Sequence, residues 1–389
     1  MRNRLPPRSA IRSVVRWHVT PVRAKERPMS EVSPLTLTDP DSAPTYGDSA
    51  FSRYCQGVLH DKRDEVFIRL TFQMLFLMVS LMGGLYAALR FAPVHPLVPV
   101  AIYLALWGYF VSPVILMLHN TMHRPFLKKH KWFDRAHPFV MSFFFGIPSG
   151  YREHHVGMHH AEDNMLHDLS STIRFQRDSF LHFLGYFFRF FFLAAVELPT
   201  YLAKNKKKGM AKRALGGEIV HLAVLGGSLA LDWRFGLTAF VAPYVLCRFM
   251  MMVGNWGQHA FINVNRKNNG ISNAITCINT PYNRRCFNDG YHISHHLMAA
   301  RHWTEHPKEL LKNRENYVAQ GAIVFQGLDF FMVSVLLWAG RYDVLAKRFV
   351  RLGEPKTDAE VEALLRERVK PVAQWEIESI GGSAERSAA

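Results

Sequence analysis

Long apolar segments separated by strongly polar loops dominate this sequence. Apolar runs at 68–89 and 97–118 are joined by the turn RFAPVHP, and runs at 218–231 and 235–253 are joined at Asp232. Apolar runs of about 20 residues cross the hydrocarbon core of a bilayer. Because turns this short connect only antiparallel neighbours, the pattern predicts two transmembrane helical hairpins, with four spans in total.

Two further apolar segments have more than one interpretation. Residues 180–203 are long enough to span, but Arg189 and Glu197 interrupt them, so we expect a helix lying in the membrane interface. Residues 318–340 contain an apolar run interrupted by Asp329, which we expect to be interfacial or packed on the bundle. A fifth span there would move the C-terminus to the outside. The sequence thus predicts an all-α membrane protein capped by cytosolic helices.

The same pattern divides the chain into four parts. Residues 1–65 form a polar N-terminal segment, and residues 66–310 form the membrane domain. Residues 311–353 contain apolar or interfacial C-terminal helices. Residues 354–389 are a polar tail, in which 357–368 is expected to be a short surface helix.

Charge separates the N-terminus from the rest of the chain. Residues 1–28 carry +7 of the net charge of +16, with one acidic residue, and lack the apolar stretch of a secretory signal. Two interpretations remain open. The stretch is an organelle transit peptide, or Met29 is the true start and the preceding residues are a mis-started extension.

Other basic residues gather in loops next to the apolar runs, as at 128–131 and 204–213. Such runs are typical of nucleic-acid binding. Beside membrane spans they are better explained by the positive-inside rule and by contact with anionic lipid, so we expect no nucleic-acid partner. The basic flanks therefore predict that both hairpins turn outside and that the long loops are cytosolic.

Histidines form four motifs beyond the inner ends of the predicted spans: HNTMH, HHVGMHH, NWGQH and HISHH. Their spacings of three and four residues place side chains on one face of a helix. A lone histidine near a helix end is usually structural, but this set on one membrane face indicates metal binding. The candidate ligands are His119, His123, His155, His159, His160, His259, His292, His295 and His296.

The number of histidines limits the kind of metal site. A tetrahedral zinc site takes four ligands, so nine imidazoles are too many for one ion and suit two. Imidazole binds zinc, copper, iron and nickel, so the ligands alone do not identify the metal. A zinc transporter would place ionisable residues within its spans, which are almost free of them, and a bis-histidine haem would leave most of the set unused.

The order HxxxH, HxxxHH, HxxHH around two hairpins resembles the integral-membrane fatty acid desaturase/hydroxylase superfamily, over about residues 66–310. Asn255 and His259 form an NxxxH element similar to that of acyl-CoA desaturases. The three residues between the histidines of the first and second motifs are more like acyl-lipid desaturases, and also like carotenoid ketolases and alkane hydroxylases.

The resemblance implies two non-haem irons held by the nine histidines, with Asn255 bound through water and O2 as co-substrate. It favours His155 over the neighbouring His154, because HxxxHH fits the family. It implies a narrow tunnel that takes an acyl lipid or acyl-CoA, among membrane lipids, in the bacterial inner membrane or in the endoplasmic reticulum or plastid. No HPGG haem motif is present, so electrons must come from a separate ferredoxin or cytochrome b5 type of carrier. A hydroxylase or ketolase acting on a lipid, alkane or carotenoid is the alternative.

Acidic residues follow the second histidine motif. Glu162, Asp163 and Asp168 are candidates for orienting ligand imidazoles. A solvated acidic loop is an equally acceptable interpretation. His167, in the same loop, is expected to be a surface or substrate-loop residue rather than a ligand.

Overall fold

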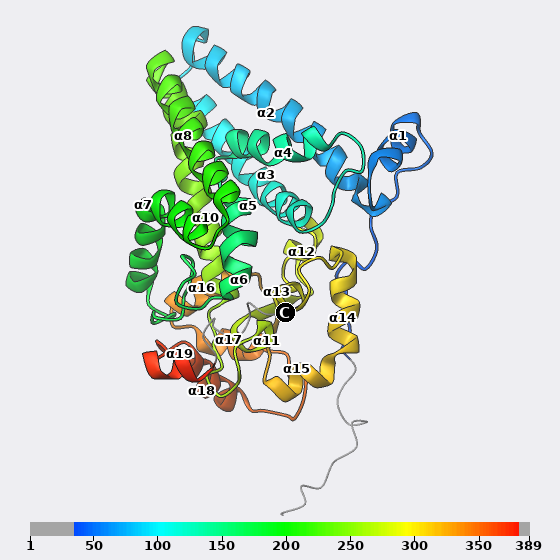
Figure 1. Cartoon of the computed structure of the whole chain (residues 1–389), viewed down its shortest axis with the longest axis vertical. Coiled ribbons are helices and arrows are strands. Elements are labelled where there is room, and N and C mark those ends of the chain that lie inside the picture. Colours follow the sequence, from blue (N-terminus) through cyan, green and yellow to red (C-terminus); the bar gives the residue numbers. More distant parts are fainter. Residues whose placement is uncertain (1–34, 381–389) are drawn as a thin grey trace, which may run out of the picture. The chain divides into compact units, whose positions relative to one another are not determined.

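The computed structural model describes residues 35–380, so the two interpretations of residues 1–28 and Met29 lie outside the described part. The described chain is mostly helical, with two short strands (Figure 1). This confirms the predicted class of a helical protein with membrane-length helices. It also adds one parallel strand pair that the sequence pattern did not predict.

Five helical stretches are long and apolar enough to cross a membrane, one more than the four predicted. The four-span count is therefore not confirmed. The stretches are built from α2 (Glu65–Phe91), α3 (Leu97–His123), α7 (Phe180–Lys204), α8 (Lys208–Leu231), and the succession of α9 (Trp233–Gly236), η4 (Leu237–Val241) and α10 (Ala242–Gln258).

Both predicted hairpins are present. Residues 92–96 connect α2 to α3, and α8 and α9 are separated by the single residue Asp232. The Asp232 carboxylate accepts hydrogen bonds from the backbone N–H groups of Arg234 (2.9 Å) and Phe235 (3.2 Å), which starts the next helix. The helix before this turn begins at Lys208, ten residues earlier than the apolar pattern predicted.

The segment predicted to lie in the interface is a continuous helix of 25 residues, α7, and its interfacial position stays a prediction. The Ser179 hydroxyl caps its first turn. The two charged side chains that interrupt its apolar run pair with each other, since Arg189 Nη2 lies 2.7 Å from Glu197 Oε2. Pairing lowers the cost of placing charges among apolar residues, so these charges do not exclude α7 from a membrane.

The predicted apolar run at 318–340 is divided into separate elements. Glycines with left-handed backbone, Gly321 (φ +68°) and Gly327 (φ +70°), flank strand β2 (Ile323–Gln326), and Asp329 caps helix α16 (Phe330–Trp338). Helix α16 packs on α10. A Cβ at Gly257 of α10 would lie 2.3 Å from the Phe330 carbonyl oxygen, so only glycine allows this approach.

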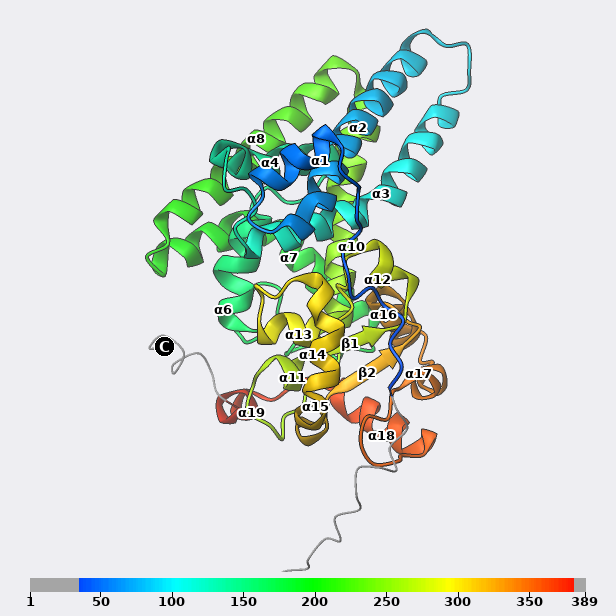
Figure 2. The same ribbon diagram turned by 90° about the vertical axis from the view of Figure 1, so that its right-hand side faces the viewer.

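Short helices from the second half of the chain form a cap beside the long helices (Figures 1 and 2). Strand β1 (Ile275–Ile278) pairs in parallel with β2 inside this cap. The predicted surface helix is present as α18, and a Thr357–Glu360 capping box starts it. The cap helices are α11 (Gly270–Asn273), α12 (Pro281–Arg285), α13 (His292–Leu297), η5 (Trp303–Glu305), α14 (His306–Lys312), α15 (Arg314–Gln320), α17 (Tyr342–Arg348), α18 (Asp358–Arg368) and α19 (Gln374–Ser379).

The remaining short helices lie before the third long helix. They are α1 (Ala50–Val58), η2 (Lys62–Asp64), α4 (Lys131–Phe145), α5 (Tyr151–His154), η3 (His155–His159) and α6 (His160–Glu162). The segment before α1 reaches the cap, because the Asp39 carboxylate accepts hydrogen bonds from the Asn279 backbone N–H (2.7 Å) and the Tyr291 hydroxyl (2.8 Å). The start of the described chain thus holds the residue that precedes α13.

Candidate metal centre

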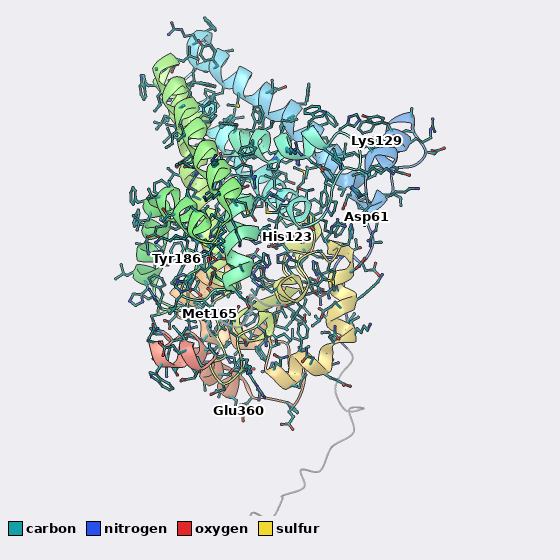
Figure 3. The ribbon with its side chains drawn as sticks, viewed as in Figure 1. Asp61, His123, Lys129, Met165, Tyr186 and Glu360 are labelled. Atoms are coloured by element: carbon teal, nitrogen blue, oxygen red, sulfur yellow. The ribbon has the colours of Figure 1, made fainter. Side chains whose placement is uncertain are left out.

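The structure brings all nine predicted histidines together in two groups. Within each group the candidate ligand nitrogens all lie within 4.8 Å of one another. His123, at the inner end of α3, lies in the middle of the described fold, whereas Lys129 lies at the periphery near α1 (Figure 3). Group 1 is His119, His123, His155, His160 and His295; group 2 is His159, His259, His292 and His296.

In group 1, imidazole Nε2 atoms converge from three distant stretches of the chain. His160 Nε2 lies 3.1 Å from His155 Nε2 and 2.9 Å from His295 Nε2. His119 Nε2, from α3, lies 3.0 Å from His295 Nε2. The Nε2 atom of His123 is buried and has no hydrogen-bond partner among the described residues. The nitrogen lone pairs of group 1 are therefore gathered around one point.

Group 2 repeats this arrangement with four histidines. His292 Nε2 lies 3.3 Å from His259 Nε2 and 3.0 Å from His296 Nε2. The His159 ring completes the group, with its centroid 5.2 Å from that of His259 and 5.3 Å from that of His296. Helix α13 therefore contributes to both groups, with His295 in group 1 and the other two histidines of the HISHH motif in group 2.

The second histidine motif adopts a π-helical turn, η3 (His155–His159). In an α-helix, residues five apart point in different directions, because each turn takes 3.6 residues. The wider turn brings His155 and His160 onto the same side, as their Nε2 separation of 3.1 Å shows. It directs His159 to the other group. π-turns occur frequently at functional sites, and the sequence pattern alone did not indicate this one.

Two of the three acidic candidates contact ligand imidazoles. Asp168 lies 2.6 Å from His159 Nδ1, and Asp163 lies 3.0 Å from His296 Nδ1. Both carboxylates are buried, so the solvated-loop interpretation is wrong for them. A carboxylate at Nδ1 holds the proton there, which leaves Nε2 free to bind a metal. Glu162 instead accepts a hydrogen bond from the Tyr201 hydroxyl.

Two further orienting groups were missed by the sequence reasoning. Asp289 Oδ1 lies 3.3 Å from His119 Nδ1, and the Asn273 carbonyl oxygen lies 2.9 Å from His259 Nδ1. Neither residue belongs to a histidine motif, and both come from the cap. Because both residues lie far in sequence from the imidazoles that they contact, no local sequence pattern indicated these contacts.

Two histidines near the second motif that were not predicted as ligands, His154 and His167, have other surroundings. His154 belongs to neither group, and its Nε2 lies 3.7 Å from Asp168 Oδ1. His155, its predicted rival, points into group 1. His167 is exposed, as expected for a surface residue.

The residues fit two bound metal ions. An imidazole nitrogen lies about 2.1 Å from a bound ion, so ligands on opposite sides of it are roughly 4 Å apart, close to the spread seen in each group. Burial and neighbouring imidazoles also lower the pKa values of four of the histidines well below 6.5, and neutral imidazole is the form that binds metal. These four are His155, His160, His292 and His295.

Acid should destabilise the metal-free protein. The unfolded chain binds protons at these four histidines below their ordinary pKa of 6.5, whereas the folded chain holds them neutral. His159 acts in the opposite direction, because burial is outweighed by Asp168 and its pKa is raised. We expect the thermal unfolding midpoint of the metal-free protein in detergent to fall by several degrees between about pH 7.5 and pH 5.5. A midpoint that stays constant or rises would contradict the neutral state of the groups.

A cavity of about 460 Å³ reaches both groups. His119 and His155 of group 1 and His159 and His292 of group 2 lie in its wall. The rest of the wall is mainly apolar, and most of it comes from α3, α7, α8, α10 and α16. Asn255 also lines the cavity but belongs to neither group, and its amide donates hydrogen bonds of 2.8 Å to the Ser170 carbonyl oxygen and the Tyr186 hydroxyl.

Membrane-length helices, nine converging histidines and an apolar cavity define a membrane protein that can hold two metal ions. The family model for fatty acid desaturases matches residues 93–327, which is more than half of the chain. The chain therefore belongs to the fatty acid desaturase family. No curated protein and no solved structure matches it.

Proposed function

We propose that this protein is a membrane-bound, O2-dependent desaturase that introduces a C=C bond into the acyl chain of a lipid. The observation that carries the proposal is the position of both histidine groups in the wall of one apolar cavity. Two irons held by groups 1 and 2 would supply the chemistry by which O2, with two electrons from a donor, removes hydrogen from an unactivated methylene. Asn255 would contact one of them through water, as in the family's NxxxH element.

The side chains of the protein position the substrate and keep water out of the cavity. Phe190, Ala194 and Leu198 recur at four-residue spacing along α7 and form one wall of the cavity. Such a wall binds an alkyl chain and excludes water, which protects the reaction from side products. The buried carboxylates of Asp163 and Asp168 hold protons on the Nδ1 atoms of ligand histidines, so that each ligand keeps one orientation.

The setting of the enzyme follows from the same proposal. Basic loops beside the spans support a location of both groups at the cytosolic face of the membrane. Electrons would come from a separate ferredoxin or cytochrome b5 type of carrier, and the substrate would be an acyl lipid or acyl-CoA. A hydroxylase or ketolase would use the same metal centre and cavity. A hydroxylase would return oxygen to the substrate carbon instead of removing a second hydrogen, and a ketolase would oxidise the same carbon a second time.

Lipid profiling would test the reaction directly. The chain and its His159→Ala variant would be expressed in a host together with a ferredoxin or cytochrome b5 system, and the double bonds would be located by mass spectrometry. We expect a new unsaturated acyl chain that is absent with His159→Ala. A hydroxylated or ketone product would agree with the proposed metal centre but would show that the reaction is hydroxylation or ketone formation instead of desaturation. No new product from an inserted, iron-loaded protein would contradict the proposal.

A further inference from the structure

An ion pair lies in the wall of the otherwise mainly apolar cavity. Arg248 of α10 and Glu218 of α8 both line it, and Arg248 Nη2 lies 3.0 Å from Glu218 Oε1 and 3.1 Å from Oε2. The two side chains are only 5% and 12% exposed. Both helices are long and apolar enough to span a membrane.

Local contacts hold this pair in place. The Arg248 guanidinium lies 3.4 Å above the centre of the Tyr244 ring, and the Tyr244 hydroxyl donates a hydrogen bond to Glu218. Arg248 Nη1 also donates to the carbonyl oxygens of Gly146 (3.1 Å) and Tyr244 (3.2 Å). The pair is therefore fixed rather than free to turn away from the cavity.

Stability alone does not account for charges at this position. A buried ion pair often stabilises a protein no more than apolar residues of similar size would. Ionisable side chains within membrane helices usually mark a ligand or transport path. Here the pair retains hydrogen-bonding capacity. Arg248 Nε–H makes no hydrogen bond with the described residues, and Glu218 Oε2 accepts only from Arg248.

We propose that the cavity takes a long-chain substrate that carries a hydroxyl group, and that Arg248 and Glu218 bind this hydroxyl. A hydroxyl matches both free functions, because it accepts from an N–H and donates to a carboxylate. Arg248 lies two turns before Asn255 on α10, so the hydroxyl would bind about 11 Å along the helix axis from that residue. This inference deepens the proposed function and rests on it for the desaturation of the substrate. The binding of the hydroxyl group does not depend on the proposed function.

Binding of two matched probes would test this inference. The full-length protein in lipid nanodiscs would be titrated with 1-hexadecanol or hexadecane, and thermal stabilisation would report half-saturation. Both probes partition into the same nanodiscs. The readout is therefore the ratio of the half-saturating concentrations of the two probes, compared between variants. We expect the native protein to prefer the alcohol by about tenfold, and Glu218→Leu/Arg248→Met to reduce the preference to less than about twofold.

The matched control is a second Arg–Glu pair. Arg189 and Glu197 also lie on a membrane-length helix and also pair, at 2.7 Å, but they do not line the cavity. Arg189→Met/Glu197→Leu should keep the native preference. Should the cavity double variant fail to fold, Glu218→Gln preserves the side-chain volume and removes the charge, and it should reduce the preference at least about threefold.

Two results would overturn the inference. The first is a native protein that does not prefer the alcohol. The second is a native preference that persists in the folded cavity double variant, or in Glu218→Gln where the double variant does not fold. Neither depends on turnover. A protein that desaturates lipid but binds both probes alike would therefore lose this inference and keep the proposed function. The reverse result would keep the hydroxyl site and remove the desaturase.

Discussion

Replacing His295 with alanine should abolish activity while the protein still inserts into the membrane. His295 Nε2 lies 3.0 Å from His119 Nε2 and 2.9 Å from His160 Nε2, so its loss opens group 1 at its centre. We expect product formation to fall at least about a hundredfold, the upper range for loss of a partner outside the ligands themselves. Iron per chain in the purified protein should fall with it. Product analysis and metal content measure the two effects separately.

His167 provides the matched control for this variant. It is exposed and belongs to neither group, although it lies a few residues from the second histidine motif. His167→Ala should retain native activity and native metal content. Full activity in His295→Ala would remove this residue from the proposed ligand set. A loss of activity in His167→Ala would show that the effect of a histidine substitution does not depend on membership of the two groups.

The second large effect should come from a residue that binds no metal. Asp168 is buried and accepts the Nδ1 proton of His159 at 2.6 Å. Burial opposes its ionisation, but the adjacent His159 and His154 hold the pKa of Asp168 well below its usual range. Asp168→Asn keeps the shape and removes the charge, so we expect the affinity for metal at group 2 to fall by at least about tenfold. Competition with a chelator measures that affinity.

Glu162 is the control for the charge itself. It lies in the same acidic stretch, but its carboxylate contacts the Tyr201 hydroxyl and no histidine. Glu162→Gln should leave metal affinity within about twofold of the native value. An equal loss in both variants would mean that the net charge of the loop, rather than the contact with His159, controls binding.

The candidate ligands were predictable because metal chemistry constrains residue type and local spacing. His119 and His123 are four apart on one helix, and the structure keeps them in one group. Spacing did not predict the division of HVGMHH between the groups, because it depends on a π-turn rather than on residue type. Asp289 and Asn273 were missed for a different reason. Their contacts with imidazoles arise only when the cap folds onto the long helices.

The membrane helices show a similar limit. Hydrophobic length located both hairpins, because burial of backbone polar groups in lipid requires long helices. It placed the start of α8 ten residues too late, since the stretch from Lys208 to residue 217, which is basic at its start, is also helical. For α7, charge within an apolar run favoured the interface, and that position stays a prediction. The pairing of Arg189 with Glu197 across two turns was not part of that reasoning.

The order in which the chain is made has a consequence for assembly. His119 and His295 are 176 positions apart, so group 1 is incomplete until most of the chain has been synthesised. Asp39, among the first residues described, contacts Tyr291 immediately before the last histidine motif. Contacts so distant in sequence form late, because the chain must first close a long loop. If the groups bind metal, we expect it to enter after membrane insertion, and a chain that stalls before residue 295 would have neither histidine group complete.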